Sequence, residues 1–551
     1  LATRQYPIYD FGLALLGCGS ALYLLVAREG LAQREGILLN FDISILGIDF
    51  LFPFEAMLGV IGIVVLLEAT RRSIGLPLVI VAVVFLVYSV FGQSMPEIIA
   101  HKGVSLTRLV GYHWLGGEAI FGIPIDVSTS FVFLFVLFGA LLDKAGAGQY
   151  FLNLAFAMVG QFRGGPAKAA ILASGMTGLI SGSSIANVVT TGTFTIPVMR
   201  KIGIPAVKAG AIEVAASVNG QIMPPIMGAA AFIIAEFIGI SYFDVIAAAF
   251  LPAFICYIAL LYISHLEAMK LGLRGLAATE IPPLRRTFLR GVHFLIPIVT
   301  LIYLLMVERW TASSSVFYAI VLLMLIIVTQ KVAHSWHSGN RMIGLAVMAG
   351  LAEIFAGLVA GARNMINIAV AVATAGIIVG AVSSTGLSNA MIEVVEVVSG
   401  GNVYILLGLT AVLCLVLGMG LPTTANYIVV ASLMAGVLVQ IGSAAGLVLP
   451  LIAVHLYVFY FYPDCVCFTI QKRIGVSIND MTTALGAGVK AHNTAWAGHT
   501  DTKTGKIPES LQRAISKVLN KEKATEQNKQ AGIQEAISAY KKEKPDHNLP
   551  D

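Results

Sequence analysis

The sequence predicts an all-α protein that crosses a membrane many times, in roughly 10–12 segments of up to about 20 residues each. Of its 551 residues, 57% are hydrophobic and only 12% are charged, whereas soluble domains carry about 25% charged residues. Several apolar runs reach or approach the length that spans a bilayer. Two further apolar runs are broken by clusters of small and hydroxylated residues. Together these observations predict a polytopic membrane protein.

The charge and the motifs of the sequence limit the classes of function that are expected. The net charge of +5 needs no nucleic-acid partner, because basic residues in loops are typical of a protein of the bacterial inner membrane. The bilayer is therefore the expected partner. The sequence lacks the H-E-x-x-H and G-x-S-x-G motifs of common hydrolases, so we do not expect an enzyme.

The N-terminal part begins with three apolar spans, at residues 9–26, 54–69 and 76–92. A basic pair at residues 71–72 predicts that the loop after the second span faces the cytoplasm. Residues 104–123 mix apolar, charged and aromatic side chains. That mixture favours an amphipathic helix lying at the membrane interface.

A second, larger unit begins at residue 128. The basic loop at residues 265–290 is expected to be cytoplasmic and to divide this unit into two halves. Residues 342–381 are rich in alanine and glycine and are interrupted by charged residues, and residues 383–386 form a further polar break. Further spans are expected at residues 128–142, 245–263, 292–307, 315–329 and 444–461.

The first interrupted segment lies at residues 180–192 and carries Ser181, Ser183, Ser184 and Asn187. Where the backbone leaves a helix inside a bilayer, its polar groups need partners, so such breaks line protein cavities. Freed carbonyls together with side-chain oxygens can coordinate a small hard cation. The alternative is a small-residue packing face whose hydroxyls bond between helices.

The second interrupted segment repeats this design at residues 417–426. Its candidate residues are Gly418, Gly420, Thr423, Thr424 and Asn426. A matching pair of interrupted apolar segments, one in each half of a chain, points to a transporter site at the interface of two repeats. The pair therefore favours cation binding at both breaks over simple packing.

A third break is predicted between residues 219 and 225. Pro224 and Pro225 remove two backbone donors there, and Asn219 and Gln221 precede them. These residues are candidates to complete the first cation site or to contact a substrate. An ionisable residue inside a membrane is a functional candidate by default.

Two charged residues are also substrate-binding candidates. Glu213 lies in the apolar arm before the third break. Arg363 would either pair with an anionic substrate or anchor a helix at the interface.

Seven segments carry a resemblance to a known family. The chain resembles the fused membrane component of tripartite ATP-independent periplasmic (TRAP) transporters of the TAXI-associated type, over about residues 10–461. The matching segments are LEATRR at 67–72, FVFLFVLFGA at 131–140, RGGPAK at 163–168, residues 181–197, QIMPPIMGAAAF at 221–232, AGIIVG at 375–380 and GMGLPTT at 418–424.

The resemblance implies an architecture and a mechanism. Residues 1–122 would be like the small membrane subunit and residues 123–462 like the large one, with two re-entrant hairpins in inverted repeats of an elevator-type transporter. A periplasmic TAXI-type binding protein would deliver a small organic anion, a carboxylate. A sodium or proton gradient would drive uptake, with sodium at the hairpin tips and no other cofactor.

The C-terminal region departs from that family. Residues 463–551 are polar and contain no span, so we expect a solvated, partly disordered tail. The family continues with an Asp/Thr-Pro-Pro motif where this chain runs into the tail, and this chain does not begin with Met. A stand-alone ion-coupled carrier, a channel and a truncated, non-functional permease therefore remain as alternatives.

Overall fold

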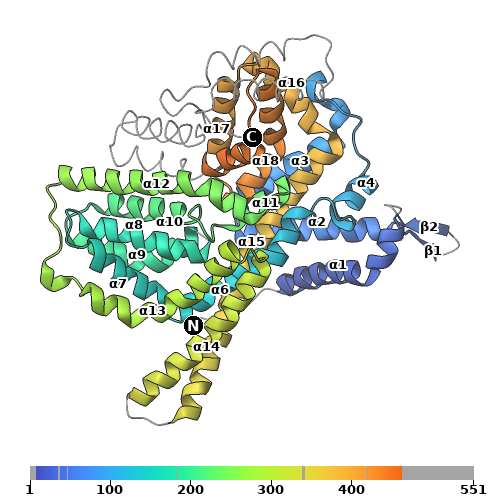
Figure 1. Ribbon diagram of the computed structural model, residues 1–551. Coiled ribbons are helices and arrows are strands. Elements are labelled where there is room, and N and C mark those ends of the chain that lie inside the picture. Colours follow the sequence, from blue (N-terminus) through green and yellow to red (C-terminus); the bar gives the residue numbers. More distant parts are fainter. Residues whose placement is uncertain are drawn as a thin grey trace, which may run out of the picture. The chain divides into compact units, whose positions relative to one another are not determined.

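The computed structural model describes residues 8–34, 38–45, 48–182, 184–337, 342–418 and 420–461, which are mainly helical (Figure 1). The prediction of an all-α protein is confirmed, apart from one short antiparallel hairpin. Strands β1 (Phe41–Ile45) and β2 (Ile48–Phe52) pair with Phe41 opposite Phe52, between the first two predicted spans. The predicted tail at residues 463–551 lies outside the described residues.

Apolar helices dominate the part of the chain that the structure describes. Seven of them are long and apolar enough to cross a membrane, and four more are apolar but only 10–17 residues long. The number of roughly 10–12 membrane segments is not tested by this count and stays a prediction. A further pair of helices, bent by 115° at a short break, passes the same test when taken together. The protein is therefore a multi-pass membrane protein.

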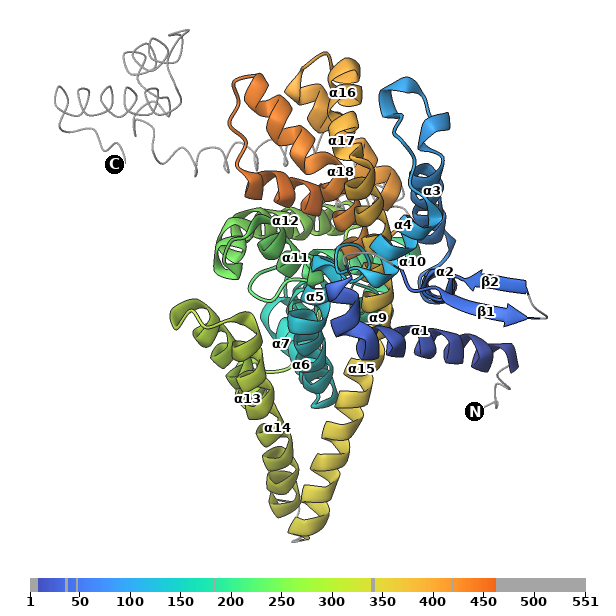
Figure 2. The same cartoon turned by 90° about the vertical axis from the view of Figure 1, so that its right-hand side faces the viewer.

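The N-terminal elements lie beside the hairpin of strands (Figure 2). Helix α3 has only 15 residues and is shorter than the predicted span at 76–92. The elements are α1 (Ile8–Gln33), α2 (Phe54–Ser73), α3 (Leu76–Val90), the 3₁₀ turns η1 (Gly92–Ser94) and η2 (Glu97–Ile99), α4 (Leu106–Val110) and the π-helical turn η3 (Gly111–Leu115).

The helix predicted at residues 104–123 forms over only part of that length, and its position at a membrane interface stays a prediction. The segment forms α4, η3 and a turn, and it buries His113 and Trp114. His113 contacts the carbonyls of Leu109, at 2.9 Å, and Ile377, at 3.2 Å. Trp114 fits against α2 because Gly62 has no side chain there. His113 thus finds its partners inside the protein, whereas Arg108 and Glu118 of the same segment are exposed.

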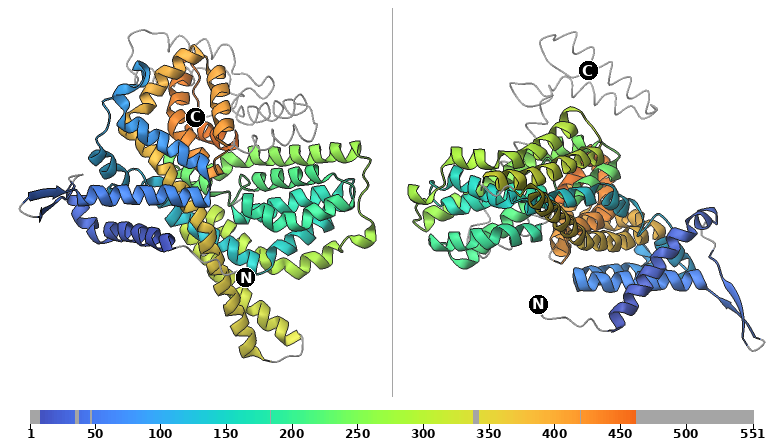
Figure 3. Two further views of the ribbon diagram at one scale, coloured as in Figure 1. Left: turned by 180° about the vertical axis from the view of Figure 1, so that it is seen from behind. Right: turned by 90° about the horizontal axis from the view of Figure 1, so that it is seen from below.

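The middle of the chain forms a group of helices around α8, α9 and α10, flanked by α7, α12 and α13 (Figures 1 and 3). The elements from residue 123 onward are α5 (Ile123–Val127), the π-helical turn η4 (Ser128–Val132), α6 (Phe133–Lys144), α7 (Ala147–Val159), α8 (Gly165–Ser181), α9 (Ser184–Lys201), α10 (Ala206–Gly220), α11 (Ala229–Ile238), α12 (Tyr242–Lys270), the 3₁₀ turn η5 (Ala278–Glu280), α13 (Leu284–Ile302), the π-helical turn η6 (Tyr303–Val307) and α14 (Ala312–His337).

The C-terminal helices begin with a single long one. Residues 343–385 form one continuous helix, so the interruptions predicted at charged residues within 342–381 are wrong. The segment contains no proline, and polar residues alone do not break a helix. The polar break predicted at residues 383–386 is confirmed, because this helix ends at Thr385 and Gly386 adopts a left-handed conformation. The elements are α15 (Ile343–Thr385), α16 (Leu387–Ser399), α17 (Val403–Gly418), α18 (Thr423–Ala444) and a final helix at Leu451–Phe461.

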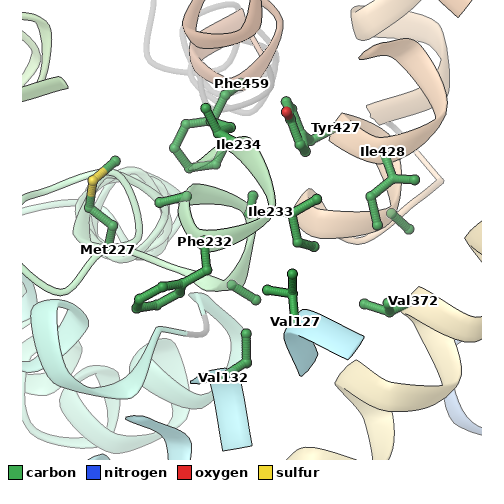
Figure 4. Packing of buried hydrophobic residues seen from close by; sticks show 14 of the residues in the cluster. Val127, Val132, Met227, Phe232, Ile233, Ile234, Val372, Tyr427, Ile428 and Phe459 are labelled. Carbon is green, nitrogen blue, oxygen red and sulfur yellow. The ribbon is translucent and has the colours of Figure 1, made fainter. Parts of the chain in front are cut away.

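The buried core centres on α11. Phe232, Ile233 and Ile234 of this short helix are buried. Figure 4 shows them among side chains from α5, α15 and α18, including Val127 and Ile428. The short helix after the third break is therefore held inside the protein by apolar packing.

Candidate functional site

The first predicted interruption is confirmed. Helix α8 ends at Ser181 and α9 begins at Ser184, and the two helices pack together as a hairpin. Gly182 forms the turn with φ of 59°, a left-handed conformation that glycine adopts without steric cost. The candidate Ser183 and the side chain of Ser181 lie outside the described residues. We call residues 181–184 the first tip.

The second predicted interruption is also confirmed. Helix α17 ends at Gly418 and α18 begins at Thr423, and these two helices also pack together. A side chain on Gly420 would meet Cβ of Pro77 in α3 at 2.7 Å, so this turn lies directly against α3. Thr423 is buried and Thr424 is partly exposed. We call residues 418–423 the second tip.

The third break lies next to the first tip. Helix α10 ends at Gly220 and α11 begins at Ala229. The connecting loop, which contains Pro224 and Pro225, is closed by a 2.7 Å hydrogen bond from the Gly228 amide to the Gln221 carbonyl. A Cβ on Gly228 would lie 3.3 Å from the Gly182 carbonyl oxygen. Two predicted breaks, separated in sequence, thus meet in space.

The Asn187 side chain links the two helices of the first hairpin by hydrogen bonds. Its Nδ2 donates to the carbonyl oxygen of Ser174 at 2.8 Å and to Oγ of Ser174 at 3.0 Å. Its Oδ1 accepts a 2.6 Å hydrogen bond from Thr177. The side chain is buried, so it connects α9 to α8 just behind the tip.

Asn426 lies in the second hairpin with a different set of contacts. Its side chain is fully buried, and Nδ2 makes one long hydrogen bond, 3.5 Å, to the Cys414 carbonyl. Its Oδ1 has no hydrogen-bond partner among the residues that the structure describes. A buried acceptor without a donor is costly, and a bound cation is one way to satisfy it.

Glu213 lies between the hairpin and α10. Its carboxylate is fully buried and is surrounded by hydroxyl groups rather than by cations. Thr191 donates to Oε1 and Thr195 donates to Oε2 at 2.5 Å. Because an anionic substrate would be repelled by this carboxylate and cannot reach it from solvent, the arrangement gives no support to direct substrate binding by Glu213.

The carbonyls at the third break have partners. The Tyr242 hydroxyl donates to the Pro225 carbonyl at 3.2 Å and also contacts that of Ile226. The Tyr460 hydroxyl contacts the Ala249 carbonyl at 2.7 Å and that of Ile222 at 3.3 Å. These tyrosine hydroxyls therefore satisfy carbonyl groups that the break would otherwise leave open.

The remaining candidates divide into two groups. Asn219 and Gln221 are buried at the end of α10, next to the first tip. Ser184 is partly exposed at the start of α9. Arg363, in contrast, is exposed on α15 and forms no ion pair within the described ranges. The structure does not bring Arg363 together with the other candidates.

Sequence reasoning missed the hydroxyl groups behind the first tip. Thr191 and Thr195 follow the predicted Asn187 at intervals of four residues on α9, and Ser217 follows the predicted Glu213 at the same interval on α10. This periodicity was available as a signal. The tyrosine partners of the third break had no such signal, because Tyr460 lies more than two hundred residues away in the chain.

Comparisons with known proteins agree with this geometry. Residues 61–463 match the family described as "Tripartite ATP-independent periplasmic transporter, DctM component". The uncharacterized protein YgiK of Salmonella typhimurium is 26% identical over 220 residues, which cover 40% of this chain and 46% of that protein.

Two named permeases match shorter stretches. Each is called "C4-dicarboxylate TRAP transporter large permease protein DctM". The protein from Rhodobacter capsulatus is 33% identical and that from Pseudomonas aeruginosa 36% identical, each over 91 residues, or 16% of this chain and 21% of the relative. The chain thus spans less than half the length of the curated relatives it matches.

The family match covers most of the chain and includes all three helix breaks. It begins within the predicted small-subunit-like region, and the boundary between residues 122 and 123 stays a prediction. With its apolar helices and its paired interruptions, the chain belongs to the DctM component family of tripartite ATP-independent periplasmic transporters, which are multi-pass proteins of the bacterial inner membrane.

Proposed function

We propose that the chain is the permease of a secondary transporter that takes up a small organic anion. A periplasmic TAXI-type binding protein delivers the anion, and a sodium gradient drives its entry. The family assignment supports a periplasmic binding protein as partner, and the names of two relatives support a carboxylate substrate. The finer assignments rest on the sequence resemblance and on the contacts at the two tips.

One observation carries the proposal. Asn187 is the fourth residue of α9, and Asn426 is the fourth residue of α18. Each helix begins with a hydroxylated residue directly after a break, and each asparagine is buried. Two such helix starts in the two halves of a membrane chain are typical of a site formed by discontinuous helices.

The tips suit a cation that must bind and leave again. The candidate ligands are backbone carbonyls and neutral side-chain oxygens, together with the unpartnered Oδ1 of Asn426. Oxygen ligands suit hard cations. Ligands without formal charge hold the ion weakly enough for release. We therefore assign sodium to the two tips.

The same helix breaks provide a binding position for the anionic substrate. The amides at a helix N-terminus favour an anion, and α9 and α18 both begin at a tip. If sodium orders a tip before the anion binds, substrate and sodium raise each other's affinity by the same factor. In this proposal the hairpins are re-entrant, and an elevator-type movement carries the loaded site across the membrane.

Uptake into proteoliposomes tests the proposal. The purified full chain is reconstituted, and a panel of radiolabelled monocarboxylates and dicarboxylates is offered with the cognate binding protein, with and without an inward sodium gradient. We expect saturable uptake that requires both the binding protein and sodium. Empty liposomes and an outward sodium gradient are the controls.

The other outcomes would contradict the proposal in distinct ways. Uptake without the binding protein would indicate a stand-alone carrier. Flux that does not saturate would indicate a channel. A folded, inserted chain that transports nothing under any gradient would indicate an incomplete permease.

A further inference from the structure

The carboxylate of Glu213 lies in a cage of hydroxyl groups from three helices. Thr191 and Thr195 of α9 donate to its two oxygens. Ser174 of α8 lies 3.4 Å from Oε1, and Ser217, one turn along α10, lies 3.5 Å from the same atom. The cage thus joins both arms of the first hairpin to α10.

No positive charge compensates this carboxylate among the described residues. Lys208 of α10 pairs with Glu267 of α12 instead. The other charged and titratable groups on the helices packed against Glu213 make no described contact with its carboxylate. They are Lys168 on α8, Arg200 and Lys201 on α9, and Tyr242, Asp244, Cys256, Tyr257, Tyr262, His265 and Lys270 on α12.

The hydroxyl groups can satisfy either protonation state of Glu213. The Thr191 hydroxyl has one hydrogen and two acceptors within reach, Oε1 of Glu213 and the Asn187 carbonyl oxygen at 2.8 Å. The Thr195 hydroxyl likewise lies between Oε2 of Glu213 and the Thr191 carbonyl oxygen at 3.0 Å. A hydroxyl both donates and accepts, and its hydrogen rotates to suit.

Both states therefore keep the same heavy-atom positions. When Glu213 is ionised, both threonine hydrogens point to the carboxylate. When it is protonated, its own O–H donates to one threonine oxygen, and that threonine turns its hydrogen to the backbone carbonyl. No polar group loses its partner in either state, so proton exchange requires no repacking.

The spacing of the oxygens suits a proton better than a metal ion. Oε2 of Glu213 lies 2.5 Å from the Thr195 oxygen, which is the distance of a strong hydrogen bond. Oxygens of different residues that bind one cation each lie at a full metal–oxygen distance from it, which keeps them farther apart than two oxygens that share a proton. Oxygens in hydrogen-bond contact leave no space for an ion between them.

We propose that Glu213 is an exchangeable proton-binding site, and that proton binding there opposes cation binding at the first tip; this linkage rests on the proposed function. Ser174 and Thr191, which contact Glu213, also hold Asn187 behind the tip. An ionised Glu213 favours a nearby cation, and a protonated one does not. Sodium binding at the first tip therefore releases a proton from Glu213 to water.

Infrared difference spectroscopy of the full chain tests the proton site directly. Spectra of purified protein are recorded across the pH range in which it stays folded. The chain has 30 Asp and Glu residues, so we expect one component of the carboxylic acid C=O absorption that appears on acidification of the wild type and is missing from Glu213→Gln, which preserves the shape of the side chain. Glu396→Gln, at an exposed position of α16, is the matched control and should keep the band.

A second variant keeps the proton site testable if Glu213→Gln does not fold. Thr195→Val removes the donor to Oε2 while it keeps the shape of the threonine. The band should then shift in frequency, because the C=O stretch responds to hydrogen bonding. A spectrum without a titrating band, or with a band that neither variant changes, would overturn the proton site.

The linkage has its own measurement, which is sodium binding to the same proteins at several pH values. We expect the apparent sodium affinity of the wild type to fall about 5-fold or more on acidification, and that of Glu213→Gln to stay constant. A pH dependence that persists in Glu213→Gln would overturn the linkage. If the wild type binds no sodium at any pH, the proposed function fails, and the infrared band still decides whether Glu213 binds a proton.

Discussion

At the scale of single residues, the two asparagines occupy equivalent positions but have different partners. Asn187 makes three short hydrogen bonds within its hairpin. Asn426 makes one long hydrogen bond and leaves Oδ1 without a partner among the described residues. We infer that Asn187 mainly holds the first hairpin together, whereas Asn426 is free to hold a ligand.

This difference predicts that the two asparagines contribute unequally to stability. Asn187→Ala leaves Thr177 and Ser174 without their buried partner, so we expect the free energy of unfolding to fall by about 1–3 kcal/mol. Asn426→Ala removes a group that is already unsatisfied, and it should leave stability nearly unchanged in the absence of sodium. Denaturant unfolding of both purified variants in detergent checks this. Equal losses in the two variants would contradict the assignment.

Each polar residue at the breaks could be predicted from the sequence, because it interrupts an otherwise apolar run. The structure confirmed the breaks themselves between residues 181 and 184, 418 and 423, and 220 and 229. Partners from distant helices were not predictable. Tyr460, which contacts the Ile222 carbonyl, meets the third break only through the tertiary fold.

At the scale of elements, the first hairpin depends on a close approach of α8 and α10. A Cβ placed on Gly178 would lie 2.6 Å from Cα of Gly220 and 2.9 Å from Nδ2 of Asn187. Backbone atoms cannot move aside easily, so the two helices touch only because both positions are glycine. This contact sets where α10 ends relative to the first tip.

The close approach predicts the effect of adding one methyl group. Gly178→Ala should lower the free energy of unfolding by about 1–3 kcal/mol through overpacking. Gly210→Ala, where a Cβ would meet nothing within 4 Å, is the matched control in α10. It should be neutral or stabilising by about 0.5–1 kcal/mol. If the two variants unfold alike, the helices do not approach as described.

Helix boundaries were predicted less well than helix identity. The sequence suggested that charged residues interrupt residues 342–381, yet α15 runs through this stretch and ends only at the predicted break at residues 383–386. Small residues explain the difference, because Gly357 and Gly361 of this helix lie against Leu141 and Leu137 of α6. These glycines therefore allow α15 and α6 to pack closely.

At the scale of the whole described chain, α15 connects regions that are distant in sequence. Thr70 of α2 and Thr374 share a buried hydrogen bond of 2.5 Å, and His113 contacts the Ile377 carbonyl. The predicted small-subunit-like region is therefore held against α15 by polar as well as apolar contacts. Such long-range contacts cannot be deduced from local patterns.

The central claim is that both tips bind sodium. A carrier driven by a sodium gradient must bind the ion before it moves. The measurement that tests it most directly is equilibrium binding of radioactive sodium to the purified full chain, compared between the wild type and Asn426→Ala. We predict saturable binding to the wild type and at least one fewer sodium ion bound by the variant, with its fold unchanged. Wild-type protein that binds no sodium, or a variant that binds it as the wild type does, would contradict the account.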